Sequence, residues 1–245
     1  MHETPPRRAL LVAGLTGAGL ALAACAPCSG NTVSASEAVL ADHGLIDRIM
    51  VGYREAAALI RANFSSVDGH LVWRLADLFR RFGEGYHQPL EEAHIFPQAM
   101  KAGGEAAALV PMLLAQHARG RQITAYLQAK TAAGAIAAAD ADGLVLALES
   151  AARMFAAHEA YEDTVVVPAW RRSLSAGGLR DAGAQLAGIE AQAFKPDGLA
   201  SALAELTAIE DALRIHDLGR YTADAPGAPA QGVIPMPPGL PEGGD

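Results

Sequence analysis

The stretch Tyr86–Pro97 carries the most specific motif of the chain, and it reads Tyr-His-Gln-Pro-Leu-Glu-Glu-Ala-His-Ile-Phe-Pro. It places His87 and Glu91 four residues apart. On an α-helix this spacing puts both side chains on one face, about 6 Å apart along the axis. An imidazole and a carboxylate arranged in this way can bind one metal ion or one pair of ions. The same spacing recurs at His158 and Glu162, so the chain carries two His-x-x-x-Glu pairs.

The composition favours a single helical domain with tails. Of the 245 residues, 51% are apolar and only 5% are aromatic. Alanine is abundant and runs of β-branched residues are rare, which favours helices over strands. The net charge of -8 argues against a nucleic-acid-binding surface. Both cysteines, Cys25 and Cys28, lie near the N-terminus, so none remains for a thiolate metal site in the rest of the chain.

Residues 1–28 are typical of a bacterial export signal. Arg7-Arg8 precede an uncharged run that is shorter than the about 20 residues a transmembrane helix needs. The run ends in Leu22-Ala23-Ala24-Cys25, which resembles a lipobox and implies lipidation at Cys25. The twin arginine resembles a Tat signal, although a full Tat motif is absent and Sec export stays open. We therefore expect a lipid anchor to the membrane at the cell envelope, on the periplasmic side or outer surface, with an uncut signal anchor as the alternative.

Apolar periodicity predicts four long helices joined by short turns, which indicates an up-down four-helix bundle of the all-α class. Ser36 is expected to cap the first helix, Pro89 to kink the second, and Gly103-Gly104 to end it. The Ala-, Gly- and Asp-rich residues 131–143 are expected to connect the last two, either as a loop or as a partly helical segment. The four helices are expected at about 36–63, 67–100, 105–129 and 144–173.

The remaining segments are expected to lie outside this bundle of residues 36–173. Residues 29–35 are predicted to form a tether. Residues 174–221 are predicted to form short C-terminal helices, at about 178–193 and 196–215. The Pro- and Gly-rich residues 222–245 are predicted to be disordered.

Counting residues from each turn places six candidate ligands in one layer. In an up-down bundle, residues equally distant from a turn lie at the same height. His43 lies 22 residues before a turn at Ser65, and His87 lies 22 residues after it. Counting from the turn at Gly103 and from the turn near Ala137 places the remaining candidate ligands at similar heights. The predicted metal ligands are His43, His87, Glu91, His117, His158 and Glu162.

Three further residues are expected near this layer. His94 shares the stripe of His87 and Glu91 but lies about 7–8 Å from the level of His117, so it either lines an access path or is an ordinary core histidine. Tyr86 and Tyr161 flank the two motifs. They could donate hydrogen bonds to the ligands or pack between helices.

The donor set suits iron, and would also accept manganese or zinc. Its residues resemble the hemerythrin-like, or HHE cation-binding, family. The resemblance covers about residues 36–173 and implies a four-helix bundle that holds a non-haem di-iron centre. Its ligand pattern falls on His43 of the first helix, His87 and Glu91 of the second, His117 of the third, and His158 and Glu162 of the fourth.

Arg121 is a departure from the oxygen-carrying members of that family, which have a histidine at this position. Its charge is expected to face the ligand layer unless the side chain turns away to solvent. The resemblance therefore implies a centre that binds or reacts with oxygen, peroxide or nitric oxide, rather than simple oxygen carriage. Whether the protein turns over a substrate stays open, and no protein partner is indicated.

Two other functions are less well supported. A ferritin-like di-iron oxidase needs two Glu-x-x-His pairs, and only Glu91 with His94 matches. A non-catalytic lipoprotein that binds a structural cation is the second alternative. Hydrolase motifs such as Gly-x-Ser-x-Gly are absent from the sequence.

Overall fold

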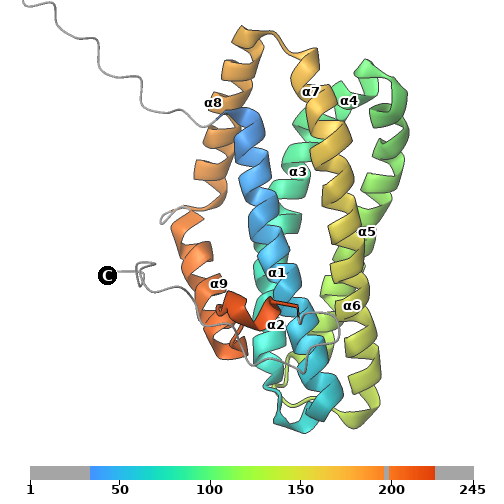
Figure 1. Ribbon diagram of the computed structural model, residues 1–245, viewed down its shortest axis with the longest axis vertical. Helices are drawn as coiled ribbons and strands as arrows, with labels where there is room; N and C mark the ends of the chain where they lie inside the picture. Colours follow the sequence, from blue (N-terminus) through green and yellow to red (C-terminus); the bar gives the residue numbers. More distant parts are fainter. Residues whose placement is uncertain (1–33, 196–198, 224–245) are drawn as a thin grey trace, which may run out of the picture. The chain divides into compact units, whose positions relative to one another are not determined.

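In the computed structural model, four long helical stretches run alternately up and down and pack side by side (Figure 1). The structure describes residues 34–195 and 199–223. Within these residues there are helices and no strands, so the predicted all-α class is confirmed. The first stretch is α1 (Ala35–Asn63) and the third is α5 (Gly104–Thr131).

The second and fourth stretches are interrupted by π-helical turns, which are rare and often occur at functional sites. The second consists of α2 (Gly69–Phe79), the π-helical segment Arg80–His87, α3 (Gln88–Leu90), the π-helical segment Glu91–Ile95, and α4 (Phe96–Ala102). The fourth consists of α6 (Ala138–Tyr161), the π-helical segment Glu162–Val166, and α7 (Val167–Ser173).

The start of α1 differs from the expected one. The Ser34 hydroxyl accepts a hydrogen bond from the Glu37 backbone, and the Glu37 carboxylate accepts one from the Ser34 backbone at 2.7 Å. This reciprocal pair satisfies two backbone donors at the helix end. The prediction that Ser36 caps the helix is therefore wrong, since Ser36 lies inside the first turn.

α6 begins at Ala138, earlier than the expected start near residue 144. Alanine-rich residues favour helix, and Asp140 lies in the first turn, where the helix dipole favours a negative charge. The Asp140 carboxylate also lies 2.7 Å from the Lys130 ammonium group. The connection between α5 and α6 is therefore shorter than the sequence indicated.

The turn between α4 and α5 matches its prediction. Gly103 and Gly104 have φ of 75° and 64°, a left-handed conformation that favours glycine. The second helical stretch begins at Gly69 rather than residue 67, because the Asp68 carboxylate caps it by accepting from the His70 backbone.

The hydrophobic core lies between the four stretches. α1 packs along α6, and α2 packs along α5. A Cβ atom at Gly120 would lie only 2.8 Å from Cζ of Phe155, so this glycine allows α5 and α6 to approach closely. The ring of Phe155 is thereby held against His158, with the ring centroids 5.5 Å apart. Core packing thus positions one of the candidate ligands.

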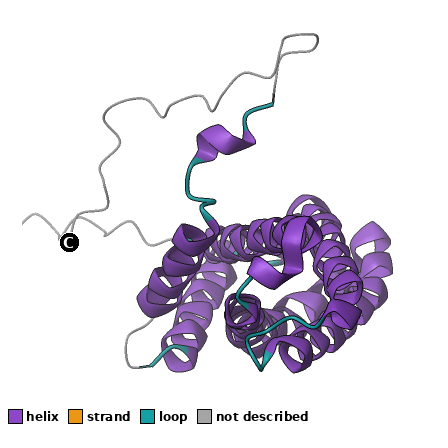
Figure 2. Ribbon diagram, turned by 90° about the horizontal axis from the view of Figure 1, so that it is seen from below, coloured by secondary structure: helices purple, strands orange, loops and turns teal. Residues whose placement is uncertain are grey.

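Two further helices cover one side of the bundle (Figures 1 and 2). α8 (Ala176–Ala193) packs along α1, and α9 (Leu199–Leu213) packs against α1 and α2. The Arg48 guanidinium donates to both carboxylate oxygens of Glu210 at 2.8 and 2.6 Å. Phe194, which follows α8, packs on the rings of Phe82 and Tyr86.

Several predictions fall outside the described residues. These are the export signal, the lipidation at Cys25, most of the tether, and the disorder of residues 224–245. Among the helices that the structure describes, none combines the length and apolar character that a membrane crossing requires.

Candidate metal centre

Two π-helical turns present the candidate carboxylates. The backbone N–H of Phe96 donates to the carbonyl of Glu91, five residues earlier, and the N–H of Val167 donates to the carbonyl of Glu162 in the same way. A proline follows each donor and has no N–H with which to continue the α-helical ladder. The chain therefore widens its turn at the two residues that the sequence identifies as metal ligands.

The expected disturbance at Pro89 takes the same form. The backbone N–H of Gln88, directly before this proline, donates to the carbonyl of Gly83, five residues back. The π-helical segment that results ends at His87. All three prolines thus help to set where the ligand-bearing residues lie.

The structure brings the six predicted ligands together at one level. Oε1 of Glu91 lies 3.4 Å from Nε2 of His43 and 3.3 Å from Nε2 of His87. Oε2 of Glu91 lies 3.5 Å from Nε2 of His117. None of the six side chains is more than 3% exposed.

Glu162 approaches the same group from the fourth stretch. Its Oε2 lies 3.1 Å from Nε2 of His158 and 3.6 Å from Nε2 of His43. Nε2 of His158 in turn lies 3.1 Å from Nε2 of His117. The ligand atoms form two overlapping sets with Glu91 in both, each within 4.8 Å; the sets are His43, His87 and Glu91, and Glu91, His117, His158 and Glu162.

Each of the four histidines is held by an oxygen acceptor at its other ring nitrogen, Nδ1. Such contacts fix the orientation and tautomer of a metal-binding imidazole. The partners are Asp163 for His43 at 2.5 Å, Asp42 for His87 at 3.2 Å, Glu92 for His117 at 2.9 Å, and Gln116 for His158 at 2.9 Å.

These donors fit a bound cation. Because Nδ1 of each histidine donates its proton outward, Nε2 of the neutral ring turns a lone pair inward. Four such lone pairs and two carboxylates then converge in a space shielded from water. Among the described residues, no hydrogen-bond partner is found for His87 Nε2, Glu91 Oε2 or either carboxylate oxygen of Glu162. Buried polar atoms without partners are costly, and a metal ion would satisfy them.

The proton affinity of His43 and His87 differs from that of His117. Burial alone would lower the pKa of His43, but hydrogen bonds to Asp163 and Glu91 outweigh it and raise the pKa to about 11. Burial is likewise outweighed at His87, where Glu91 and Asp42 raise the pKa to about 9. At His117 burial prevails and lowers the pKa to about 4. Without metal, the first set therefore carries protons that a metal ion has to displace.

The two carboxylates also differ. Burial would raise the pKa of Glu91, but His87 and His43 hold it well below its usual range. Burial raises the pKa of Glu162, and the nearby Glu91 carboxylate adds to this effect. Glu91 is therefore the more anionic of the two.

A small cavity of about 10 Å³ lies among these side chains. This is about the space of one water molecule. Gln88 and Glu159 line it together with the six candidate ligands, and both are buried. Burial and the neighbouring Asp47 raise the pKa of Glu159 to about 9, so it is a neutral acid at pH 7. The cavity admits only a very small molecule.

The other predicted residues lie around this group rather than within it. Arg121 is 42% exposed, and its guanidinium donates to Gln88 at 3.1 Å and lies 3.5 Å from Glu92. Tyr86 is buried against Phe82 and Phe194.

Tyr161 and His94 lie outside the cluster of candidate ligands. Tyr161 is 52% exposed. His94 is partly buried and makes no side-chain hydrogen bond to any residue the structure describes. Neither side chain is among those that line the cavity.

The four residues that hold the histidines were missed from the sequence. The sequence does contain a pattern that marks these four residues. An acidic residue directly follows each candidate glutamate, and a polar residue directly precedes each candidate histidine that lies outside the two His-x-x-x-Glu motifs. His-x-x-x-Glu-(Glu/Asp) thus occurs twice. The residues concerned are Glu92, Asp163, Asp42 and Gln116.

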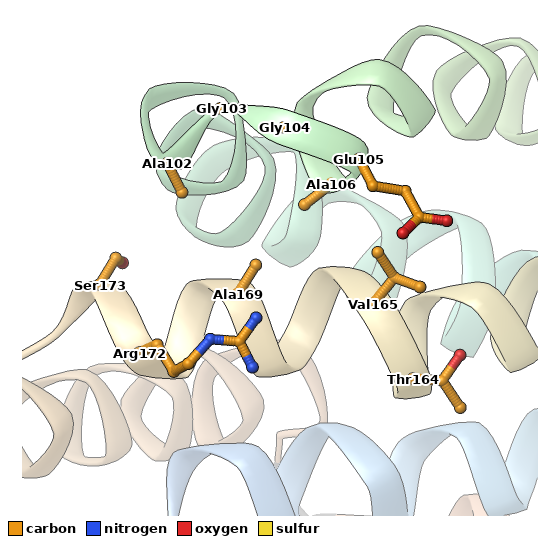
Figure 3. A pocket seen from close by; sticks show the side chains of 10 residues that line it. All are labelled: Ala102, Gly103, Gly104, Glu105, Ala106, Thr164, Val165, Ala169, Arg172 and Ser173. Atoms are coloured by element: carbon orange, nitrogen blue, oxygen red, sulfur yellow. The ribbon is translucent and has the colours of Figure 1, made fainter.

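A larger hollow of about 560 Å³ lies where the α4–α5 turn faces the fourth stretch (Figure 3). Its charged side chains are Glu105 and Arg172, and no histidine lines it. It shares no residue with the small cavity, so it plays no part in the candidate centre.

Comparison with known proteins agrees with this geometry. Residues 34–170 match the family model of the hemerythrin HHE cation binding domain. The chain is 36% identical over 242 residues to the uncharacterized protein Rv1995 of Mycobacterium tuberculosis and to the uncharacterized protein Mb2018 of Mycobacterium bovis, covering 91% of this chain and 94% of each relative. No solved structure matches. The chain belongs to the hemerythrin HHE cation-binding family.

Proposed function

We propose that this protein holds a non-haem di-iron centre that binds or reacts with a small ligand such as oxygen, peroxide or nitric oxide. The observation that carries the proposal is the convergence of four inward-facing imidazole nitrogens and two carboxylates in two overlapping sets. The six proposed ligands are His43, His87, Glu91, His117, His158 and Glu162.

The types of donor atom favour iron as the metal, and their arrangement favours two ions. Mixed imidazole and carboxylate donors suit iron, and also accept manganese or zinc. A carboxylate that belongs to two ligand sets, as Glu91 does, is suited to lie between two cations. Iron bound here would supply redox chemistry and open coordination positions for a small ligand.

The chain's own residues prepare the site for this chemistry. The oxygen acceptors at Nδ1 keep each imidazole in the tautomer that binds a metal. The core around the group excludes bulk water, and the cavity of about 10 Å³ excludes organic substrates. A cavity of this size favours a very small ligand.

The proposed location is the cell envelope, with a lipid on Cys25 as the anchor. The support is the lipobox-like Leu22-Ala23-Ala24-Cys25 behind an apolar run with a charged start. Mass spectrometry of the protein from a membrane fraction should show a lipid-modified N-terminal cysteine. A mature chain that begins elsewhere, or an intact Met1, would contradict this location.

The geometry disfavours the ferritin-like alternative. That site needs His94 to join Glu91 as a ligand, and His94 is in neither ligand set. A structural cation without reactivity uses the same residues, so metal identity and reactivity distinguish it from the proposal.

The test of the proposed function is the iron content of the full chain after expression in iron-supplied medium. About two iron atoms per chain are expected from the two ligand sets. Iron that changes its absorption spectrum on adding peroxide, oxygen or nitric oxide would support reactivity. One tightly held zinc ion, or no metal, would count against the di-iron proposal.

A further inference from the structure

Gln88 is a buried amide that the candidate ligand set does not use. It directly follows His87, is 2% exposed, and lines the small cavity. The π-helical turn before it fixes its backbone, because its N–H bonds to the carbonyl of Gly83. Its side chain therefore starts from a well-defined position beside the centre.

Arg121 fixes which way the Gln88 amide faces. Nη1 of Arg121 lies 3.1 Å from Oε1 of Gln88. A guanidinium has only hydrogen-bond donors, so the amide oxygen has to turn toward it. The NH2 group of Gln88 is then directed away from Arg121.

That NH2 group has no acceptor among the described residues, although it is buried. Buried donors are almost always satisfied, and an exception needs an explanation. The residues that share the cavity with Gln88 are the six candidate ligands and a few neighbours. A small molecule held at the centre would be the acceptor that the protein does not supply.

We propose that Gln88, oriented by Arg121, donates a hydrogen bond to the small ligand bound at the metal centre. This inference rests on the proposed function and adds the residue that recognises the ligand. Gln88 is the ligand-binding residue, and Arg121 is a positioning residue that acts through it. Ligands that carry a partial negative charge on an outer atom, such as nitric oxide, oxygen or peroxide, would gain from this contact.

The test compares Gln88→Leu with the unaltered full chain, both loaded with iron, with nitric oxide as the probe. Leucine keeps a similar volume and removes the donor. Nitric oxide should dissociate about tenfold faster from the variant, because one hydrogen bond to the ligand is lost. The N–O stretching frequency should rise, because the hydrogen bond no longer draws charge onto the oxygen atom. Iron content should stay unchanged.

Gln122→Leu is the matched control, since Gln122 is exposed on α5. It should leave the dissociation rate and the stretching frequency unchanged. Equal values for Gln88→Leu, Gln122→Leu and the unaltered chain would overturn the inference while leaving the iron centre intact. An unaltered chain without iron would instead overturn the proposed function, and this inference with it.

Arg121→Met keeps the test decisive if Gln88→Leu fails to fold or to hold iron. It leaves Gln88 and all six candidate ligands in place and removes the group that orients the amide. Nitric oxide should dissociate faster from it by a smaller factor than from Gln88→Leu, with the same direction of frequency shift. Unchanged values for Arg121→Met would overturn the inference.

Discussion

The first two helical stretches and the last two build the centre by the same scheme but give it different charge. Each pair of stretches supplies one single histidine and one His-x-x-x-Glu motif. Both histidines turn Nε2 inward and donate a hydrogen bond from Nδ1 to an oxygen acceptor. The acceptor of His87 is the carboxylate of Asp42, whereas the acceptor of His158 is the neutral amide of Gln116. The acceptor of the motif histidine is therefore charged in the first half and neutral in the second, although the geometry is the same.

The buried residues that directly follow His87 and His158 differ in the opposite sense. Buried Glu159 has the acidic neighbour Asp47, whereas Gln88 at the matching position has the basic neighbour Arg121. The pKa of His87 is raised to about 9 and that of His117 is lowered to about 4. The repeated backbone thus fixes where the candidate metal ligands lie, while the side chains around them set how each half holds protons.

The largest expected effect comes from the residue that both ligand sets share. Glu91→Ala should lose both iron atoms, because Glu91 belongs to both sets. Glu162→Ala should keep about one, since the set of His43, His87 and Glu91 remains complete. Elemental analysis of the two variants checks this, with circular dichroism to confirm that both are folded. Full iron content in Glu91→Ala would contradict the ligand assignment.

The next effect is a steep dependence of metal uptake on pH. A metal ion needs neutral imidazoles, so it has to displace the protons of His43 and His87, whose pKa values are raised to about 11 and about 9. Below pH 9 the apparent affinity should rise up to about a hundredfold per pH unit, because two protons are released. Between pH 9 and 11 only the proton of His43 remains to be displaced.

His117 adds nothing to this dependence above pH 5, because its pKa is lowered to about 4 and it is already neutral. Competition titrations with a metal indicator between pH 6 and 8 measure the slope. A slope near zero would show that the first half does not hold its protons in the metal-free protein.

The fold could be predicted from the sequence because its signals are local. Apolar periodicity marks each long helix, and Gly103-Gly104 marks a turn that requires left-handed backbone. The common level of the six candidate ligands follows from counting along rigid helices, because an error of two residues moves a side chain by only about 3 Å.

The surroundings of the centre were harder to predict, because they depend on departures from the α-helix. The sequence placed His94 on the stripe of His87, seven residues away. His94 lies within the π-helical turn Glu91–Ile95, where the α-helical period is broken, and it is in neither ligand set. The hydrogen bonds that Asp42 and Asp163 accept from histidines cross between helices, and periodicity within one helix gives no information on such contacts.

A smaller effect is expected from Glu159, the buried acid on α6 in the second half. The pKa of Glu159 is raised to about 9 by burial, above the ordinary value of 4.5. Between these two pH values, unfolding releases a proton, so the metal-free protein loses stability as pH rises. Glutamine does not titrate, so Glu159→Gln should be more stable than the unaltered chain by about 2–4 kcal/mol at pH 7.

Urea unfolding of the metal-free protein at pH 5 and pH 8 measures this difference. The gain should be small at pH 5 and larger at pH 8. The exposed Glu105→Gln is the matched control and should show little change at either pH. A gain that is equal at both pH values would mean that Glu159 is not held neutral by burial.

The smallest expected effect separates the two carboxylates that act on His87. Asp42→Asn keeps an oxygen that can accept from Nδ1 but removes the charge. The contact with Glu91 at Nε2 remains at 3.3 Å, and Glu91 acts on the pKa of His87 more strongly than Asp42 does. The pKa of His87 in the metal-free protein should therefore fall by only about one unit, measured by NMR titration of the imidazole. A fall to the ordinary value would mean that the flanking aspartate, rather than the shared glutamate, gives the first half its protons.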